Sequence, residues 1–371
     1  MDRAVRGITD EDRAVFLSLV TTNLTEEQVR MVLTPNTIRP RQKDVLAIHW
    51  HPEWVPLDLV ARRIAAGFPF CQHSLIIPTQ HNELMVMGNY AGVEVDCYAT
   101  GFNRKIQLLL HFSAARVAKA GVIKSMLEHT FKYRVGQLFE IMDSITNSEY
   151  NERMEAAVSE TGSNEEVAAM ARFYTARLRQ LIMDNQSTTP MQMIKNRLIP
   201  DFLRAQSKHH PKSLIKRAVM LVQSVKQIVK RYFSMAYFFR VNEVIEETRY
   251  LGGGVVIPHP EQFWPVLLAD YDVDGYEVWN PESREYTEFL IGALNRQNRL
   301  RGPGRRSLLI FMGDDTHMSV KVRDPETQEP SKLEREIGFQ PAWDDVAVQR
   351  SLSLAGASRT QIIERYKERL G

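Results

Sequence analysis

Residues 45–51, Val-Leu-Ala-Ile-His-Trp-His, decide the fold, because an apolar run ends there in two histidines one position apart. Six later runs share this design, in which an apolar stretch ends in polar, mostly metal-binding side chains: LIIPTQH 75–81, GVEVD 92–96, IQLLLH 106–111, GGVVIPH 253–259, GYEVWN 275–280 and SLLIFMGDDTH 307–317. Six of the ten histidines lie at or just past such an end. Strands that deliver polar side chains to one rim are typical of a parallel α/β barrel, where that rim carries the chemistry.

The segments between these runs are helical. Residues 58–67, DLVARRIAAG, separate the first two runs, and strand–helix–strand alternation favours parallel pairing. From 113 to 249 the sequence has helical periods and no strand pattern. We therefore expect four parts: an N-terminal helical segment (1–43), a barrel in two pieces (44–112 and 250–345), a helical insertion (113–249) and a C-terminal helix (346–371).

The composition is that of a soluble globular protein, with 44% hydrophobic and 25% charged residues. The formal charge of +2 gives no overall attraction to nucleic acids or acidic membranes. Two cysteines are too few for a disulfide scaffold or a thiolate zinc site. The N-terminus has no apolar leader, and no apolar stretch reaches the ~18 residues of a membrane span. We therefore expect a cytoplasmic protein without a membrane partner.

Pairs of side chains at alternate positions indicate the chemistry. His49 and His51 share one side of a strand, because alternate residues of a strand face the same way, and such a pair can hold a divalent ion. Asp315 and His317 repeat this geometry with a carboxylate. An H-x-H pair alone is equally compatible with two hydrogen-bonded histidines. Further candidate ligands accompany the pairs: His81, Glu94, His111, which follows three leucines and needs a partner or a metal, and His259.

In order and spacing, these motifs resemble the PHP superfamily (polymerase and histidinol phosphatase) of metal-dependent phosphoesterases. The matching pieces are His49-x-His51 with Asp58, Thr79-x-His81, Gly92–Glu94, the LLH ending at His111, His259-Pro260, the GYEVWN with Glu277 and Asn280, and Gly313–His317. They lie within residues 44–112 and 250–320. The resemblance implies a distorted (β/α)7 barrel, with the helical insertion between strands 4 and 5. The chain departs from the family pattern at Pro52-Glu53-Trp54, Gln80 and Asp314; we expect the last two to orient ligands.

The resemblance also implies two or three divalent metal ions. One ion would be held by His49, His51, Glu94 and Asp315, a second by Glu94, His111 and His259, and a third by Asp58, His81 and His317. Imidazole and carboxylate together suit Zn²⁺, Mn²⁺ or Fe²⁺ better than Mg²⁺ or Ca²⁺. The place of Asp58 depends on an inferred loop alignment, so a two-ion centre remains an alternative.

Such a cluster predicts hydrolysis of a phosphate ester by a metal-bound hydroxide, because the ions acidify water and neutralise charge on the ester. Asp315 or His317 would carry the proton. Arg104 and Arg284 follow ligand strands and would bind the substrate phosphate, which arginine can hold in a bidentate manner. The predicted enzyme is a phosphoesterase for a phosphorylated small molecule, a phosphatase more than a nuclease.

The insertion leaves alternatives open. Residues 202–242 contain basic side chains and no acid, which would suit a nucleic acid. The same face could instead meet the acidic stretch Glu140–Glu166 or form a homodimer interface. A nuclease or exonuclease is the second prediction. A non-catalytic, metal-stabilised interaction module is the third, and the full ligand set argues against it. Amidohydrolases also begin with H-x-H, but they need a bridging carbamylated lysine where this chain has Glu94.

Overall fold

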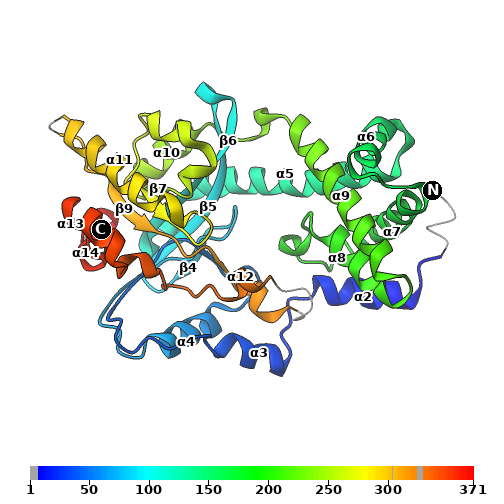
Figure 1. Cartoon of the computed structure of the whole chain (residues 1–371), viewed down its shortest axis with the longest axis horizontal. Coiled ribbons are helices and arrows are strands. Elements are labelled where there is room, and N and C mark those ends of the chain that lie inside the picture. Colours follow the sequence, from blue (N-terminus) through cyan, green and yellow to red (C-terminus); the bar gives the residue numbers. More distant parts are fainter. Residues whose placement is uncertain (1–6, 303, 324–328) are drawn as a thin grey trace. The chain divides into compact units, whose positions relative to one another are not determined.

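The computed structural model describes residues 7–302, 304–323 and 329–371, and the chain folds into two compact units. One unit, which we call the strand unit, holds Leu24–Thr130 and Met235–Gly371 and contains every described strand. The other, the helical unit, holds the described residues up to Asn23 together with Phe131–Ser234. Both are drawn in Figure 1. The segment expected as one N-terminal part is therefore divided between the two units.

Ten strands are described in the strand unit. They are β1 (Asp44–Ala47), β2 (Trp50–His51), β3 (His73–Ile76), β4 (Met85–Met87), β5 (Tyr90–Ala99), β6 (Arg104–Ser113), β7 (Gly254–Ile257), β8 (Gly275–Trp279), β9 (Leu309–Met312) and β10 (Thr316–His317). Six of them form one sheet in the order β4-β5-β6-β7-β8-β9, and the others form the pairs β1-β3 and β10-β2. The mixed α/β class is confirmed. The described strands close no hydrogen-bonded ring, so the seven-stranded barrel is not confirmed.

The pairing of β5 with β6 is antiparallel, and here the expectation of parallel strands was wrong. Residues 100–102 form one turn of 3-10 helix, and Asn103 follows in the left-handed region with φ +50°. A connection this short reverses the chain, whereas a parallel connection needs a crossover of a dozen or more residues. As a result Glu94 lies opposite Leu109, and His111 lies opposite Gly92. The strands β7, β8 and β9 are parallel, as expected.

Thirteen α-helices are described. They are α2 (Asp10–Val20), α3 (Glu26–Leu33), α4 (Leu57–Gly67), α5 (Gly121–Thr146), α6 (Asn151–Thr161), α7 (Glu165–Asp184), α8 (Leu198–Ala205), α9 (Lys212–Tyr232), α10 (Val241–Tyr250), α11 (Thr287–Leu300), α12 (Pro330–Leu333), α13 (Val346–Leu354) and α14 (Arg359–Leu370). Thr9 and Thr25 close capping boxes at the starts of α2 and α3, which satisfies backbone N–H groups that a helix start leaves free.

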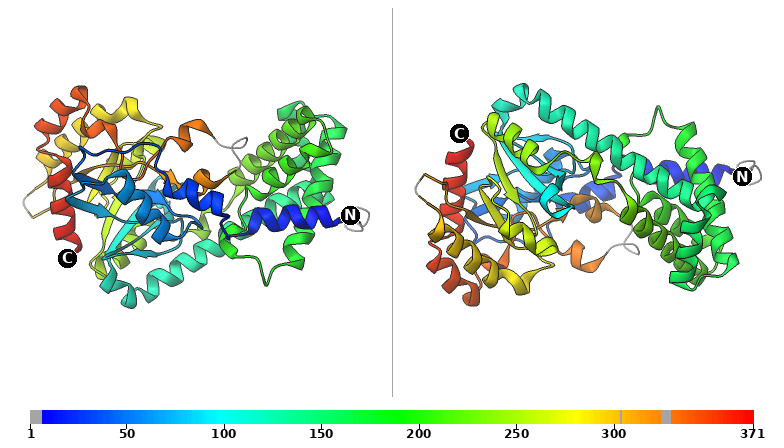
Figure 2. Two further views of the ribbon diagram at one scale, coloured as in Figure 1. Left: turned by 90° about the horizontal axis from the view of Figure 1, so that it is seen from below. Right: turned by 90° about the horizontal axis from the view of Figure 1, so that it is seen from above.

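Helix α14 packs against the strands and helps to form the main core. Its side chains Ile362, Ile363 and Tyr366 are buried, and the helix contacts β1, β3, β6 and β9. Figure 2 shows it in red beside these strands in both views. Ser358 caps its first turn by accepting a hydrogen bond from the backbone N–H of Gln361. The helix thus brings the Tyr366 hydroxyl under the sheet, where it meets His111.

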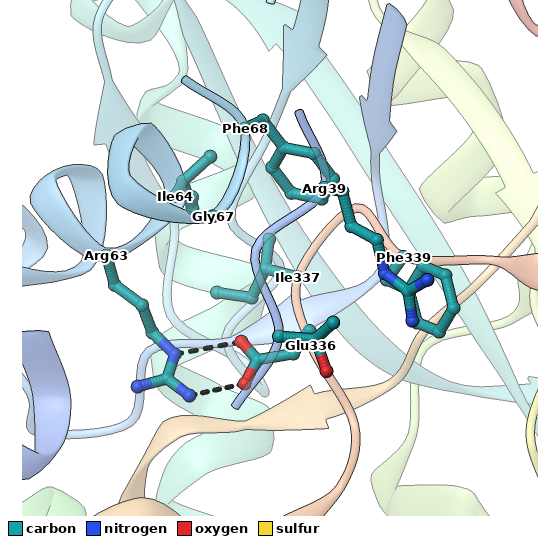
Figure 3. Close-up of a pocket in the computed structure, with 9 residues that line it drawn as sticks. Arg39, Arg63, Ile64, Gly67, Phe68, Glu336, Ile337 and Phe339 are labelled. Atoms are coloured by element: carbon teal, nitrogen blue, oxygen red, sulfur yellow. Dashed lines mark hydrogen bonds and ion pairs between the residues drawn. The ribbon is translucent and has the colours of Figure 1, made fainter. Parts of the chain in front are cut away.

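A second, smaller core surrounds a buried ion pair. Arg63 of α4 is 2% exposed, and its guanidinium donates to both carboxylate oxygens of Glu336, as Figure 3 shows. Its Nη1 also donates to the backbone carbonyls of Met31, Val32 and Thr34. The cavity beside the pair measures about 10 Å³, which is room for roughly one water molecule. We therefore interpret these charges as structural.

Within the helical unit, α9 buries one face against α6, α7 and α8. Its apolar residues recur every three or four positions, so Ile215, Val222, Val225 and Val229 all lie on the buried side. Helix α2 contacts α7 and α8 in the same unit. Figure 2 shows the blue α2 among the green helices.

Candidate metal centre

The strand unit brings seven polar side chains together, from five separate segments of the sequence. We call them the metal cluster: His49, His51, His81, Glu94, His259, Asp315 and His317. The pairing of β2 with β10 sets His51 beside His317, and an isolated bridge sets His81 beside Glu94. The H-x-H pair of His49 and His51 and the D-x-H pair of Asp315 and His317 therefore lie side by side on neighbouring strands. All seven residues were expected at the site.

Two carboxylates lie among the five imidazoles. The Oδ1 atom of Asp315 is 3.6 Å from Nε2 of His49, 3.3 Å from Nε2 of His51 and 3.4 Å from Nε2 of His317. Two ligands of one tetrahedral Zn²⁺, each about 2.0–2.2 Å from the ion, are separated by roughly 3.3–3.6 Å. The carboxylate–imidazole distances therefore match ligands that converge on shared ions.

Glu94 occupies the centre of the cluster. Its Oε1 is 3.9 Å from Nε2 of His49 and 3.7 Å from Nε2 of His259, and its Oε2 is 3.6 Å from Nε2 of His51. Oε2 also contacts Nδ1 of His81. Because its two oxygens face different imidazoles, Glu94 has the geometry of a carboxylate that bridges two positions.

The most informative feature is a set of buried polar atoms without hydrogen bonds. Apart from the contact between Oε2 of Glu94 and Nδ1 of His81, neither ring nitrogen of His51 and neither oxygen of Glu94 makes a hydrogen bond with a described residue, although both side chains are 1% exposed. A buried polar atom left in this way costs about 1–3 kcal/mol, and more when it is charged. Metal ions bound to these atoms would remove that cost. Two groups of three could hold an ion: His49, His51 and Glu94, and His51, His81 and His317.

Burial and neighbouring charges shift the pKa values within the cluster. Burial, with help from His317 and His81, lowers the pKa of His51 to about 3, so its ring is neutral and able to bind a metal. Burial also disfavours the charged form of His49, but Glu277, Asp315 and Glu94 outweigh it and raise that pKa to about 10. The surrounding imidazoles outweigh burial at Glu94 and hold its pKa well below the usual value. Glu94 is therefore an anionic ligand.

Two further carboxylates orient imidazoles of the cluster. Oε1 of Glu277 is 2.9 Å from Nδ1 of His49, which leaves Nε2 of that ring directed at Glu94 and Asp315. Oε1 of Glu53 is 3.8 Å from Nδ1 of His317, whose Nε2 faces Asp315. Carboxylates that fix the far nitrogen of an imidazole raise its basicity as a ligand. Glu53 was noted in the sequence only as a departure from the family pattern, and Glu277 only as part of a motif.

Gly313 makes room for the contact between Glu277 and His49. A Cβ atom at this position would overlap the Glu277 carboxylate and lie 3.1 Å from Nδ1 of His49. The substitution Gly313→Ala should therefore displace the carboxylate and weaken metal binding roughly 10–100-fold. Isothermal titration with Zn²⁺ measures this. Gly292→Ala, where a Cβ meets nothing within 4 Å, is the matched control, and an unchanged Kd for Gly313→Ala would contradict the role of Glu277.

No sequence pattern points to Arg335, which contacts Asp315. Its Nη1 donates to the backbone oxygen and to Oδ2 of Asp315, each at 3.0 Å, and its Nη2 donates to Glu282. The guanidinium is 4% exposed and holds Oδ2, so that Oδ1 faces the imidazoles. Arg335 comes about twenty residues after the last ligand motif and belongs to no strand, so no periodicity could reveal it.

The backbone is strained around the cluster. Glu53, Asn82, His259 and Asp315 all have positive φ, with values of +54°, +54°, +30° and +45°. Such values are uncommon for residues other than glycine and cost of order 1–3 kcal/mol each. Three of these residues carry side chains described above as part of the centre or its support.

His111 does not join the cluster. Its Nδ1 is 2.7 Å from the Tyr366 hydroxyl, and its Nε2 is 3.0 Å from the backbone oxygen of Ile48. Because β5 and β6 are antiparallel, His111 is level with Gly92, about 7 Å along the strand from Glu94. Burial lowers the pKa of His111 to about 3. Both ring nitrogens of His111 are thus engaged by other groups in this structure, and its role as a metal ligand stays a prediction.

Asp58 also lies outside the cluster. It is exposed in the first turn of α4 and contacts no described residue of the cluster. The positive φ of Glu53 turns the loop after His51 so that Glu53 approaches His317.

Of the two residues expected to orient ligands, Gln80 accepts a hydrogen bond from the backbone N–H of Glu53. Asp314 accepts a hydrogen bond from the backbone N–H of Thr316, which lies between Asp315 and His317, and also accepts from Gly338 and Gln340 of a later segment.

The two arginines expected to bind substrate are both exposed. Arg104 begins β6 opposite Ala99, five residues beyond Glu94, which is roughly 17 Å along the strand. Arg284 follows β8 in a short 3-10 helix, Arg284–Tyr286. No contact of either with the cluster is described, and their roles stay predictions.

The basic stretch of the insertion meets acidic side chains within the helical unit. Arg231 of α9 lies 4.0 Å from Glu160 of α6, and Ser224 donates a hydrogen bond to the same carboxylate at 2.7 Å. This is the contact expected if the basic face meets the acidic stretch. Nucleic acid as a partner stays a prediction, as does a homodimer. No helix of the described chain has the length and hydropathy needed to cross a membrane.

A scan against protein-family models gave no match, and no curated protein matched the sequence. Among solved structures, a proposed metal-dependent phosphoesterase from Bifidobacterium adolescentis is 17% identical, covering 85% of this chain and 98% of its own, with a TM-score of 0.42. An amidohydrolase from Chromobacterium violaceum, with bound sulfate and no metal, is 14% identical, covering 84% and 97%, with a TM-score of 0.40. At such scores neither likeness bears on the reaction, and the resemblance to the PHP superfamily stays a prediction.

Proposed function

We propose that this chain is a metal-dependent hydrolase that cleaves phosphate esters. The observation that carries the proposal is the set of buried His51 and Glu94 atoms without hydrogen bonds, at the centre of a cluster of five imidazoles and two carboxylates. His49, His51, Glu94 and Asp315 would hold one ion, and His81 and His317 would hold another with the carboxylates. When bound, divalent ions acidify water and neutralise the charge of a phosphoryl group.

The chain's own residues determine from which side a substrate arrives. His49, His51 and Glu94 are 1% exposed, whereas Asp315 and His317 are 26% and 27% exposed and His81 is 23% exposed. A phosphate ester would therefore approach from the side of Asp315, His317 and His81. Asp315 and His317 are also the candidates for carrying the proton, and Arg335 would hold Asp315 in place from the side that faces away from the imidazoles.

A small phosphorylated molecule is the preferred substrate class. A nuclease would need a cationic path for the nucleic acid, and part of the basic stretch of α9 is already paired with Glu160. An amidohydrolase would need a lysine between the ions, and in this chain Glu94 stands at that position between the imidazoles.

The test compares three substrates with protein loaded with Mn²⁺ or Zn²⁺: a phosphomonoester, a phosphodiester and a single-stranded oligonucleotide. We expect turnover of the monoester and a loss of at least about 100-fold in Asp315→Ala, because this carboxylate faces three imidazoles. The exposed His73, which pairs with Asp44 away from the cluster, gives the control His73→Ala.

Oligonucleotide cleavage that falls as salt rises would replace the phosphatase proposal with a nuclease. No turnover of any of the three by protein shown to hold ions would contradict the proposed phosphoesterase activity.

A further inference from the structure

The number of ions that the centre can bind depends on whether His111 can act as a ligand. In the resemblance, one of three ions would be held by Glu94, His111 and His259. That ion needs a lone pair from His111, and removing His111 leaves this position with Glu94 and His259 alone. Protein metal sites of this type use at least three protein ligands.

Both nitrogens of His111 are already used. The Ile48 carbonyl can only accept, so Nε2 of His111 carries the hydrogen at 3.0 Å. Nδ1 is then the acceptor for the Tyr366 O–H at 2.7 Å. Metal binding through either nitrogen would break one of these buried hydrogen bonds. The Ile48 carbonyl or the Tyr366 hydroxyl would then be buried without a partner, which costs free energy.

The surrounding glycines show how closely the His111–Tyr366 pair is packed. A Cβ at Gly92 would lie 3.2 Å from the His111 ring, and a Cβ at Gly254 would collide with the Tyr366 ring. His111 and Tyr366 are both fully buried. The ring therefore has no free space in which to turn toward Glu94.

Among the described residues, the remaining ligands form two groups of three, which share His51. His49, His51 and Glu94 converge, and so do His51, His81 and His317. The neutral ring of His51 has one lone pair and would serve one ion, so Asp315 would complete the other set. Asp315 Oδ1 lies within 3.6 Å of an imidazole nitrogen from each group. From this geometry we infer that the centre binds two divalent ions and not three, and that His111 with Tyr366 is a structural pair beneath it. The inference rests on the proposed metal centre.

A direct count of tightly bound metal tests the inference without using activity. Protein saturated with Mn²⁺ is passed through a desalting column, and the ions per chain are counted by mass spectrometry of the elements. We expect two ions in the wild type and two in Tyr366→Phe, which frees Nδ1 of His111 while keeping the packing. His111→Gln should also keep two ions, and its melting temperature shows whether it has folded.

His317→Ala is the positive control and should lose an ion. Three ions in the wild type, or fewer in Tyr366→Phe or folded His111→Gln than in the wild type, would overturn the inference while leaving the proposed function intact. A wild type that holds no ion would overturn both. Spin coupling between two Mn²⁺ ions in the electron paramagnetic resonance spectrum gives a second, independent readout, and its absence at a count of two would contradict a shared centre.

Discussion

Saturating Zn²⁺ or Mn²⁺ should raise the melting temperature of the wild-type protein by roughly 5–10 °C, and His51→Ala should abolish this rise. An ion present at 100 times its Kd stabilises the folded state by about 2.7 kcal/mol, which gives a shift of this size in a protein of ordinary domain dimensions. His51 belongs to both groups of potential ligands, so its loss affects both positions.

In the metal-free protein the same variant should lower stability only through the packing lost where the buried His51 ring stacks on His81 and His317. Neither nitrogen of His51 makes a hydrogen bond with a described residue, so the alanine breaks none. Differential scanning fluorimetry with and without the ion measures both effects. His73→Ala, with an exposed imidazole at the start of β3, should keep the full metal response. A metal response that survives in His51→Ala would contradict the proposed centre.

Glu336→Gln should destabilise the strand unit by about 3–5 kcal/mol. The carboxylate of Glu336 is paired with Arg63 and lies 3.6 Å from Nζ of Lys321, and both cations are 2% exposed. Removing one member of a buried ion pair leaves an uncompensated charge, and here it leaves two. The backbone N–H of Asn36, which donates to Glu336 at 2.8 Å, would also face the weaker amide acceptor.

Urea unfolding followed by tryptophan fluorescence measures this loss. Glu334→Gln removes the same charge two residues earlier on an exposed side chain and should change the free energy of unfolding by less than about 0.5 kcal/mol. Similar unfolding midpoints for the two variants would show that the Arg63–Glu336 pair contributes little to stability.

The sequence predicted most of the cluster because each ligand marks its strand. His49 and His51, like Asp315 and His317, face the same way through simple alternation, and the apolar run before each pair locates the strand. Helices such as α4 lie between the apolar runs, as expected from the sequence. What alternation cannot supply is the direction in which the next strand runs. His111, expected among the ligands, is hydrogen-bonded to Tyr366 and Ile48 in this structure.

The segment between the two strands also carries a hairpin signal. Gly101 and Asn103 lie between two strong strand patterns, and a gap of a few residues that contains glycine is typical of a hairpin. Read in that way, the sequence would have set His111 opposite Gly92, one diagonal position from Glu94. Arg335 and Glu53 depend instead on loops and on contacts between distant segments, which a single sequence does not encode in a readable pattern.

The positive φ angles of Glu53, His259 and Asp315 have a consequence for the evolution of this fold. Glycine would occupy each of these positions at lower conformational cost, so a lineage released from the need to bind metal should drift toward glycine there and become more stable. In an alignment of relatives, glycine at the positions of His259 and Asp315 would thus mark chains that have lost the reaction while keeping the fold. The same glycine substitutions would give a more stable protein that lacks the proposed metal centre.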